Sequence, residues 1–235
     1  MNEPTYLVVG SKPWNRHVFQ TVLRTKPGRW RFISERDELT HARLLADAPH
    51  YVFFLHWSWK VPADIVRDFE CICFHMTDVP YGRGGSPLQN LIVRGHHETK
   101  LTALRMTAEL DAGPVYLKRP LSLEGSAEEI LMRANTISAA MIEEILQTSS
   151  KPTPQSGPVT VFKRRTPAES EVPSLPSVEA MHDFIRMLDA EGYPRAFIEL
   201  NGFHYEFSRA SLRDGRIAAD VTITPIQKTQ QEEAK

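Results

Sequence analysis

The fold is decided by residues 51–75, which run YVFFLHWSWKVPADIVRDFECICFH. Tyr51–His56 and Cys71–His75 are short and almost entirely apolar, as strands buried on both faces are. Between them, Pro62 can occupy the first turn of a helix, and apolar side chains recur on one face of Pro62–Glu70. This strand–helix–strand unit predicts two strands of a parallel sheet.

The alternation of strands and helices extends from this unit toward the N-terminus. Further elements are predicted at Thr5–Gly10 (strand), Asn15–Arg24 (helix), Trp30–Ser34 (strand) and Leu39–Asp47 (helix). Four strands separated by three helices predict an α/β fold, with a mostly parallel, Rossmann-like sheet and helices on both faces. Ligands of such sheets lie beyond the carboxyl ends of the strands, where His56 and His75 are both expected.

Downstream of residue 75 the sequence predicts more elements and then a change of composition. These elements are Leu88–Arg94 (helix), Thr99–Met106 and Val115–Leu123 (strands), Ser126–Gln147 (helix opened by a capping box) and Ser177–Asp189 (helix). Six of the seventeen prolines fall within residues 151–176, which predicts a linker or an extended crossing segment. Asn201-Gly202 between two apolar runs predicts a β-hairpin. We therefore expect a main domain over residues 1–150, a Pro-rich linker over 151–176 and a small β-rich subdomain over 177–235.

Composition and charge limit the class of protein. Of the 235 residues, 41% are hydrophobic and 24% are charged, as in ordinary globular proteins. The chain has 28 Lys and Arg against 29 Asp and Glu, whereas proteins that bind nucleic-acid phosphates usually have a basic surplus. No stretch reaches the ~18 uncharged apolar residues that a membrane span needs. We therefore expect a cytoplasmic protein that acts on a small molecule, with no nucleic-acid or membrane partner.

The residues that can carry chemistry lie within residues 73–114. His75 ends a predicted strand, which suits acid–base work, and a carboxylate such as Asp111 would fix its tautomer. The residues alone leave a purely structural role open for both side chains. His96 and His97 are adjacent, so their side chains diverge, and we expect no metal site. Without a G-x-G-x-x-G or a P-loop motif, neither NAD nor ATP is expected.

Several positions in this segment match a family pattern. They are His75, Thr77, Pro80, Arg83-Gly84, Pro87, Thr102 and Asp111-Ala112-Gly113-Pro114. With Asp111 placed 36 residues after His75, the pattern resembles the formyltransferases that use N10-formyltetrahydrofolate. The resemblance covers about Thr5–Gln147 and implies direct transfer of a formyl group to an amine, without a metal. It also implies that His75 stabilises the oxyanion and relays a proton, and that Asp111 holds His75.

One catalytic position departs from the family pattern. Cys73 stands where the family has an Asn whose amide donates to the developing oxyanion, and a thiol is a weak donor. Three explanations are open. Another donor, such as Asn90 or a backbone N–H, substitutes for the amide; Cys73 suffices; or the protein is slow or inactive.

The resemblance also implies two sets of binding residues. For the folate we expect contacts at His56, Trp57, Ser58, Trp59, Met106 and Leu110. For the amine substrate we expect contacts at Lys12, Trp14, Tyr81, Arg83 and Gly84. For Trp57 and Trp59 a hydrophobic plug is an equal alternative. For Lys12 and Trp14 a solvated helix start is the favoured interpretation.

The acceptor is predicted from charge and from the C-terminal segment. From Lys151 onward there are 11 basic and 12 acidic residues, which argues against tRNA. Residues 184–188 and 193–197 resemble sugar N-formyltransferases, including those of pseudaminic-acid pathways. The resemblance implies a homodimer that formylates a UDP-linked 4-amino-4,6-dideoxy sugar for surface-glycan synthesis. Three alternatives are a methionyl-tRNA formyltransferase, a formyl-folate hydrolase and a non-catalytic folate-binding scaffold.

Overall fold

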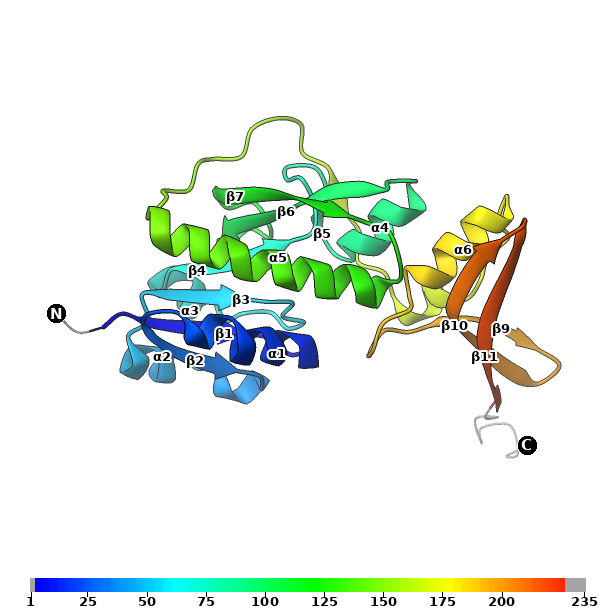
Figure 1. Ribbon diagram of the computed structural model, residues 1–235, viewed down its shortest axis with the longest axis horizontal. Helices are drawn as coiled ribbons and strands as arrows, with labels where there is room; N and C mark the ends of the chain where they lie inside the picture. Colours follow the sequence, from blue (N-terminus) through cyan, green and yellow to red (C-terminus); the bar gives the residue numbers. More distant parts are fainter. Residues whose placement is uncertain (1–2, 227–235) are drawn as a thin grey trace, which may run out of the picture.

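The main element of the fold is a six-stranded sheet with helices on both faces (Figure 1). The computed structural model describes residues 3–226. The strands, in spatial order, are β2 (Arg29–Ile33), β1 (Thr5–Val9), β3 (Tyr51–Phe54), β4 (Cys71–His75), β6 (Glu98–Arg105) and β7 (Val115–Ser122). The first four run parallel, and β6 and β7 join antiparallel. The predicted α/β fold with a mostly parallel sheet is confirmed.

Each face of the sheet buries its own cluster of apolar side chains. Because successive residues of a strand point to opposite faces, Val8 enters a large cluster while Leu7 and Val9 enter a smaller one. The large cluster is covered by α1 (Pro13–Thr21) and α5 (Ala127–Thr148), and the smaller one by α2 (His41–Asp47) and α3 (Ala63–Asp68). Short helical turns lie at η1 (Leu23–Thr25) and η2 (Arg36–Glu38), and α4 (Pro87–Val93) follows β4.

The long helix α5 begins where its capping box predicts. The Ser126 hydroxyl accepts from the backbone N–H of Glu129, while the Glu129 carboxylate accepts from the backbone N–H of Ser126. None of the helices within residues 3–226 is long and apolar enough to cross a membrane.

The segment over residues 151–176 crosses the α/β body in an extended form. Thr153 bonds to Val115 through two backbone hydrogen bonds, and the short strand β8 (Val161–Phe162) pairs with β5 (Arg83–Gly84). Phe162 is buried, and a short helical turn, η3 (Pro167–Ser170), follows. Of the two predicted forms, the extended crossing is the one observed, whereas the proposed domain limits remain a prediction.

The C-terminal part consists of one helix and an antiparallel sheet. Its elements are α6 (Val178–Arg186), β9 (Ala196–Leu200), β10 (Phe203–Arg213) and β11 (Arg216–Pro225). The predicted hairpin is confirmed: Asn201 and Gly202 join β9 and β10, with φ values of 52° and 82°. The Arg186 guanidinium fixes this part to the α/β body by donating to the carbonyls of Leu123 (2.6 Å) and Gly125 (2.9 Å).

Candidate active site at the carboxyl rim of the sheet

His75 and Asp111 meet at the carboxyl rim, the edge where β3 and β4 end. His75 is the last residue of β4 and is 8% exposed. Its Nε2 lies 2.8 Å from the carbonyl oxygen of Gly82, and its Nδ1 lies 3.6 Å from Asp111 Oδ2. Because a carbonyl oxygen only accepts, Nε2 carries the proton in the neutral ring. The Nδ1 lone pair of neutral His75 therefore lies on the side of the Asp111 carboxylate.

The Asp111 backbone and carboxylate are held by two other segments. The backbone N–H of Gly84 donates to Asp111 Oδ2 at 2.9 Å. The Gln155 side-chain amide donates to the carbonyls of Asp111 and Gly113, both at 2.8 Å. Asp111 itself has φ 53°, a left-handed conformation that these bonds help to hold. Gln155 was missed in the sequence because it lies in a Pro-rich segment without periodicity.

Arg83, an expected substrate contact, binds other side chains of the protein through its guanidinium. Its guanidinium donates to Gln155 Oε1 at 2.9 Å and 3.1 Å and pairs with Glu109 at 3.3 Å. Arg83 thereby orients the same Gln155 amide that holds Asp111.

The glycines that follow Tyr81 are required by the crossing segment. A Cβ at Gly82 would lie 2.7 Å from the side chains of Phe162 and Thr77, and a Cβ at Gly84 would overlap the carbonyl of Phe162. Both glycines have positive φ, which L-residues adopt at a cost. Phe162 of β8 therefore packs directly against both glycines, while the expected substrate contact at Gly84 remains a prediction. Tyr81 itself hydrogen-bonds His96, at 3.1 Å.

Two buried threonines support the strand that carries His75. Thr102 pairs with His75 in the β4–β6 register, and its hydroxyl donates to the carbonyl of Thr77 at 2.7 Å. The Thr77 hydroxyl donates to the Gly82 carbonyl that also accepts from His75. These hydrogen bonds therefore fix the carbonyl that accepts from His75 and, through it, the position of the imidazole.

Cys73 is on the same face of β4 as His75, two residues earlier. Burial raises the pKa of the Cys73 thiol, and the negative charge of Asp111 raises it further. The side chain at the position of the family Asn is therefore a neutral thiol, a weak hydrogen-bond donor.

The side-chain amide of Asn90, the expected substitute donor to the oxyanion, is engaged in hydrogen bonds with the protein itself. Its Nδ2 donates to the carbonyls of Gly85 (3.2 Å), Ser86 (3.0 Å) and Lys163 (3.0 Å), and its Oδ1 accepts from Arg94 at 2.8 Å. With both amide protons engaged, Asn90 ties α4 to the crossing segment. The structure gives it no free proton for an oxyanion.

The expected folate contacts divide between the two faces of the sheet. Trp57 and Met106 pack, with Cys73, against the smaller cluster, and the rings of Trp57 and Trp59 lie edge to face at 4.7 Å. Ser58 and Leu110 are exposed. His56 instead faces the large cluster, where its Nε2 is 3.3 Å from the hydroxyl of Tyr193.

His56 belongs to a cluster with Lys12 and Trp14, two expected substrate contacts. The Lys12 ammonium donates to the Glu191 carbonyl at 3.1 Å and lies between the rings of Trp14 and Tyr193, 5.9 Å and 5.7 Å from their centroids. Burial and, to a smaller extent, the charge of Lys12 together lower the pKa of His56 to about 4. This cluster fixes the segment after α6 to the start of α1.

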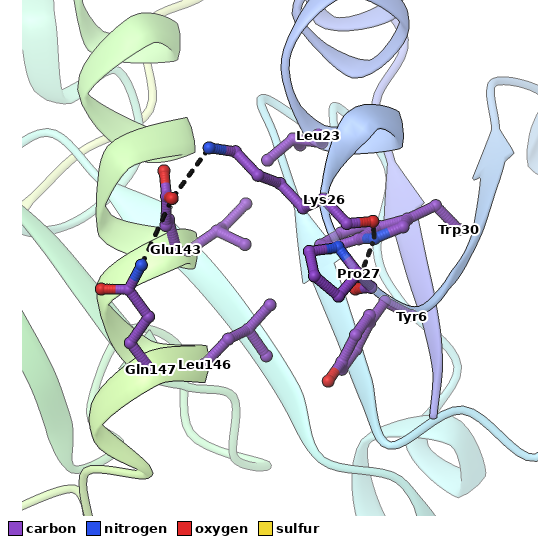
Figure 2. A pocket seen from close by; sticks show the side chains of 9 residues that line it. Tyr6, Leu23, Lys26, Pro27, Trp30, Glu143, Leu146 and Gln147 are labelled. Carbon is purple, nitrogen blue, oxygen red and sulfur yellow. Dashed lines mark hydrogen bonds and ion pairs between the residues drawn. The ribbon is translucent and has the colours of Figure 1, made fainter. Parts of the chain in front are cut away.

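One cavity lies away from the rim. It has a volume of about 250 Å³ and lies between the C-terminal part of α5 and the β1–η1–β2 edge, where Lys26 and Glu143 form a 2.8 Å ion pair (Figure 2). Neither His75 nor Asp111 lines it. Within residues 3–226 no group of three or more His, Cys, Asp or Glu side chains is arranged to hold a metal ion.

The comparisons with known proteins agree on one family. A family profile described as "Methionyl-tRNA formyltransferase, C-terminal domain" matches residues 167–224. The solved structure of "Methionyl-tRNA formyltransferase from Clostridium thermocellum" is 44% identical, with a TM-score of 0.92, and the match covers 94% of this chain and 99% of that one. A methionyl-tRNA formyltransferase of Sinorhizobium medicae is 30% identical over 72% of this chain, and the match spans only 56% of the relative's length.

A more distant structure shares the fold. HypX from Aquifex aeolicus, solved in complex with tetrahydrofolic acid, is 15% identical, with a TM-score of 0.70. The match covers 87% of this chain and 37% of HypX.

These findings correct the predicted acceptor and partners. The relatives are methionyl-tRNA formyltransferases, so the expected nucleotide-sugar acceptor and the expected absence of a nucleic-acid partner are wrong. Net charge misled because a sum over the whole chain, or over the residues from Lys151 onward, does not show local clusters, whereas Lys163, Arg164 and Arg165 are consecutive and follow β8 directly. The resemblance to formyltransferases itself is confirmed. By its 44% identity to a solved relative that it matches almost from end to end, this chain belongs to the formyltransferase family that includes the methionyl-tRNA formyltransferases.

Proposed function

We propose that this chain transfers a formyl group from N10-formyltetrahydrofolate to the amino group of methionyl-tRNA, in the cytoplasm. Family membership supports the reaction, and the His75–Asp111 pair at the rim is the observation that carries it. The folate supplies the formyl group, and the protein's own residues position the reactants and move the proton.

His75 is arranged to accept a proton at Nδ1. Its Nε2 proton is held by the Gly82 carbonyl, so the free lone pair is on Nδ1. When Nδ1 takes the proton that the attacking amine loses, the imidazolium lies 3.6 Å from the Asp111 carboxylate. In this arrangement the proton moves from the amine to Nδ1 of His75, on the side of the ring that faces the Asp111 carboxylate.

The loop after β3 fits a flat ligand with polar edges. Trp57 and Trp59 follow β3 and supply aromatic surface, and the indole Nε1 of Trp57 is buried without a partner in the described residues. The pteridine of the folate has this combination of flat faces and hydrogen-bonding edges.

A local group of basic side chains supports a tRNA acceptor. Lys163 and Arg164 are exposed beyond β8, and Arg94 stacks on Phe162, 4.6 Å from its centroid. Asn90 and Gly85 connect this group to the turn that carries Gly84, which holds Asp111. Phosphates bound here would lie beside the catalytic rim, where the aminoacyl end has to arrive.

The test measures formyl transfer to purified methionyl-tRNA with N10-formyltetrahydrofolate as donor. We expect formylmethionyl-tRNA to form with the wild-type protein and to fall about 10²- to 10⁴-fold with His75→Ala. Circular dichroism should show that the variant retains its fold. Formate release without tRNA would favour a hydrolase, and folate binding without turnover would favour a scaffold; either result would contradict the proposal.

A further inference from the structure

The loop that leads to Asp111 is exposed and needs hydrogen bonds to fix its conformation. Residues 107–110, which precede Asp111, are all exposed. Asp111 itself has φ 53°, in the left-handed region that L-residues adopt at a cost. Because the direction of the Cα–Cβ bond follows the backbone, relaxation of this φ would turn the carboxylate away from His75. The position of the carboxylate therefore depends on the bonds that hold the loop.

Gln155 supplies two of these bonds from a segment distant in the sequence. Its Nε2 donates to the carbonyl oxygens of Asp111 and Gly113, each at 2.8 Å. Gln155 is half-buried, whereas Pro154 and Ser156 on either side of it are exposed. The extended crossing segment therefore directs this side chain toward the Asp111 loop.

The partners of the Gln155 amide determine its orientation. Arg83 has only donors, and its Nε and Nη2 lie 3.1 Å and 2.9 Å from Gln155 Oε1. The carbonyls of Asp111 and Gly113 only accept, so the NH2 group has to face them. A flipped amide would oppose donor to donor and acceptor to acceptor. Both ends of the amide are engaged within the protein, so Gln155 is suited to hold the loop.

The crossing segment holds the His75 side of the site separately, through its backbone. The Thr160 carbonyl accepts from the N–H groups of Gly82 (2.9 Å) and Arg83 (3.0 Å). The Gly82 carbonyl in turn accepts from His75 Nε2. A change of the Gln155 side chain therefore removes the bonds to the Asp111 loop while the backbone bonds on the His75 side remain.

We infer that Gln155 is a positioning residue for formyl transfer, an inference that rests on the proposed function. Its amide keeps Asp111 in the left-handed conformation, with Oδ2 3.6 Å from His75 Nδ1. Gln155 acts on the reaction through Asp111, without a contact of its own to the reacting atoms. A displacement of about 1 Å in a catalytic site can lower the rate about 10²-fold, which sets the scale of the expected effect.

The experiment compares two Gln→Met variants of the full chain, which keep the side-chain length and remove the amide. For Gln155→Met we expect the rate constant of formyl transfer at saturating donor and tRNA to fall about 10- to 100-fold. The KM for N10-formyltetrahydrofolate should stay within twofold. The matched control is Gln89→Met, since Gln89 is 4% exposed and its amide donates to the carbonyl of Met187 at 3.0 Å. Its urea midpoint should fall, but its rate constant should stay within twofold of the wild type.

A double-mutant cycle with Asp111→Asn separates positioning from a general structural role. In the Asp111→Asn protein, Gln155→Met should change the rate constant less than about twofold, because the carboxylate that Gln155 positions is already gone. Losses that multiplied would show that Gln155 acts by another route and would overturn the inference.

A second variant keeps the test valid if circular dichroism shows that Gln155→Met does not fold. The carboxylate of Gln155→Glu can still accept from Arg83 but has no proton for the two carbonyls, so its rate constant should fall at least as far. A wild-type rate constant in either folded variant would overturn the inference and leave the proposed function standing. If the wild type itself formed no formylmethionyl-tRNA, both the inference and the proposed function would fail.

Discussion

Gly84 and Asp111 are joined by a 2.9 Å hydrogen bond from the glycine N–H to the carboxylate oxygen that also faces His75. The same oxygen therefore receives a fixed backbone donor on one side and the imidazole on the other. The Gly84 N–H thereby fixes the position of the Asp111 carboxylate next to His75.

Asp111→Asn should lower the rate of formyl transfer about 10²-fold or more, with little change in folate affinity. The amide keeps the shape and can still accept from Gly84, but it has no charge to stabilise the protonated His75. Single-turnover kinetics with preloaded folate would measure the step. Glu109→Gln is the matched control, since Glu109 is exposed and pairs with Arg83; it should stay within twofold of the wild type.

Gly84→Ala should destabilise the protein by about 3 kcal/mol or more, because its Cβ would overlap the Phe162 carbonyl at a positive φ. Gly95→Ala is the control: Gly95 also has positive φ, but nothing lies within 4 Å of its Cβ. Its cost should be about 1 kcal/mol. Urea unfolding measures both, and equal losses would contradict the role of β8 in fixing the turn.

Cys73→Asn should raise the rate constant of formyl transfer about tenfold or more. An amide N–H is a much better donor to a developing oxyanion than a neutral thiol, and donors of this kind contribute about 3 kcal/mol when they are removed. The KM for tRNA should not change. A slower variant would show that another group already supplies this bond.

The free energy of unfolding should decrease as the pH is lowered from about 6.5 to about 4, because His56 becomes protonated more readily in the unfolded chain. Its pKa is about 4 in the folded state and near 6.5 when unfolded, so in this range the unfolded chain binds more protons. This contribution to the free energy of unfolding is fully present above pH 6.5 and is lost as the pH falls toward 4; its size is about 3 kcal/mol.

His56→Gln, which cannot titrate, should flatten the dependence of the urea midpoint on pH over that range. His17→Gln is the control, since His17 is exposed on α1 and should leave the curve unchanged. If His56→Gln kept the wild-type slope, another group would be responsible.

The strongly patterned elements were predictable from the sequence. β4 begins and ends at the predicted residues, and α5 begins directly after its capping residue, because an apolar run and a capping box are local signals. β8 and Gln155 were not predictable. A two-residue strand among prolines has no period, and its pairing with β5 is a contact between distant segments.

The site was predicted only in part. The motif brought His75 and Asp111 together, and the structure places them 3.6 Å apart. The sequence did not show that Asn90 and Arg83 are occupied by bonds within the protein, since such partners depend on the folded loops. The acceptor was mispredicted because net charge does not show where three consecutive basic residues lie.

The bonds from Gln155 to the carbonyls of Asp111 and Gly113 have a consequence for synthesis on the ribosome. A nascent chain that has emerged as far as residue 150 already contains the whole parallel sheet, His75 and Asp111, but neither Gln155 nor β8. The Asp111 loop then has no partner for these carbonyls. The growing polypeptide should therefore acquire its folded α/β body before its catalytic geometry, which is completed only when the next dozen residues leave the exit tunnel.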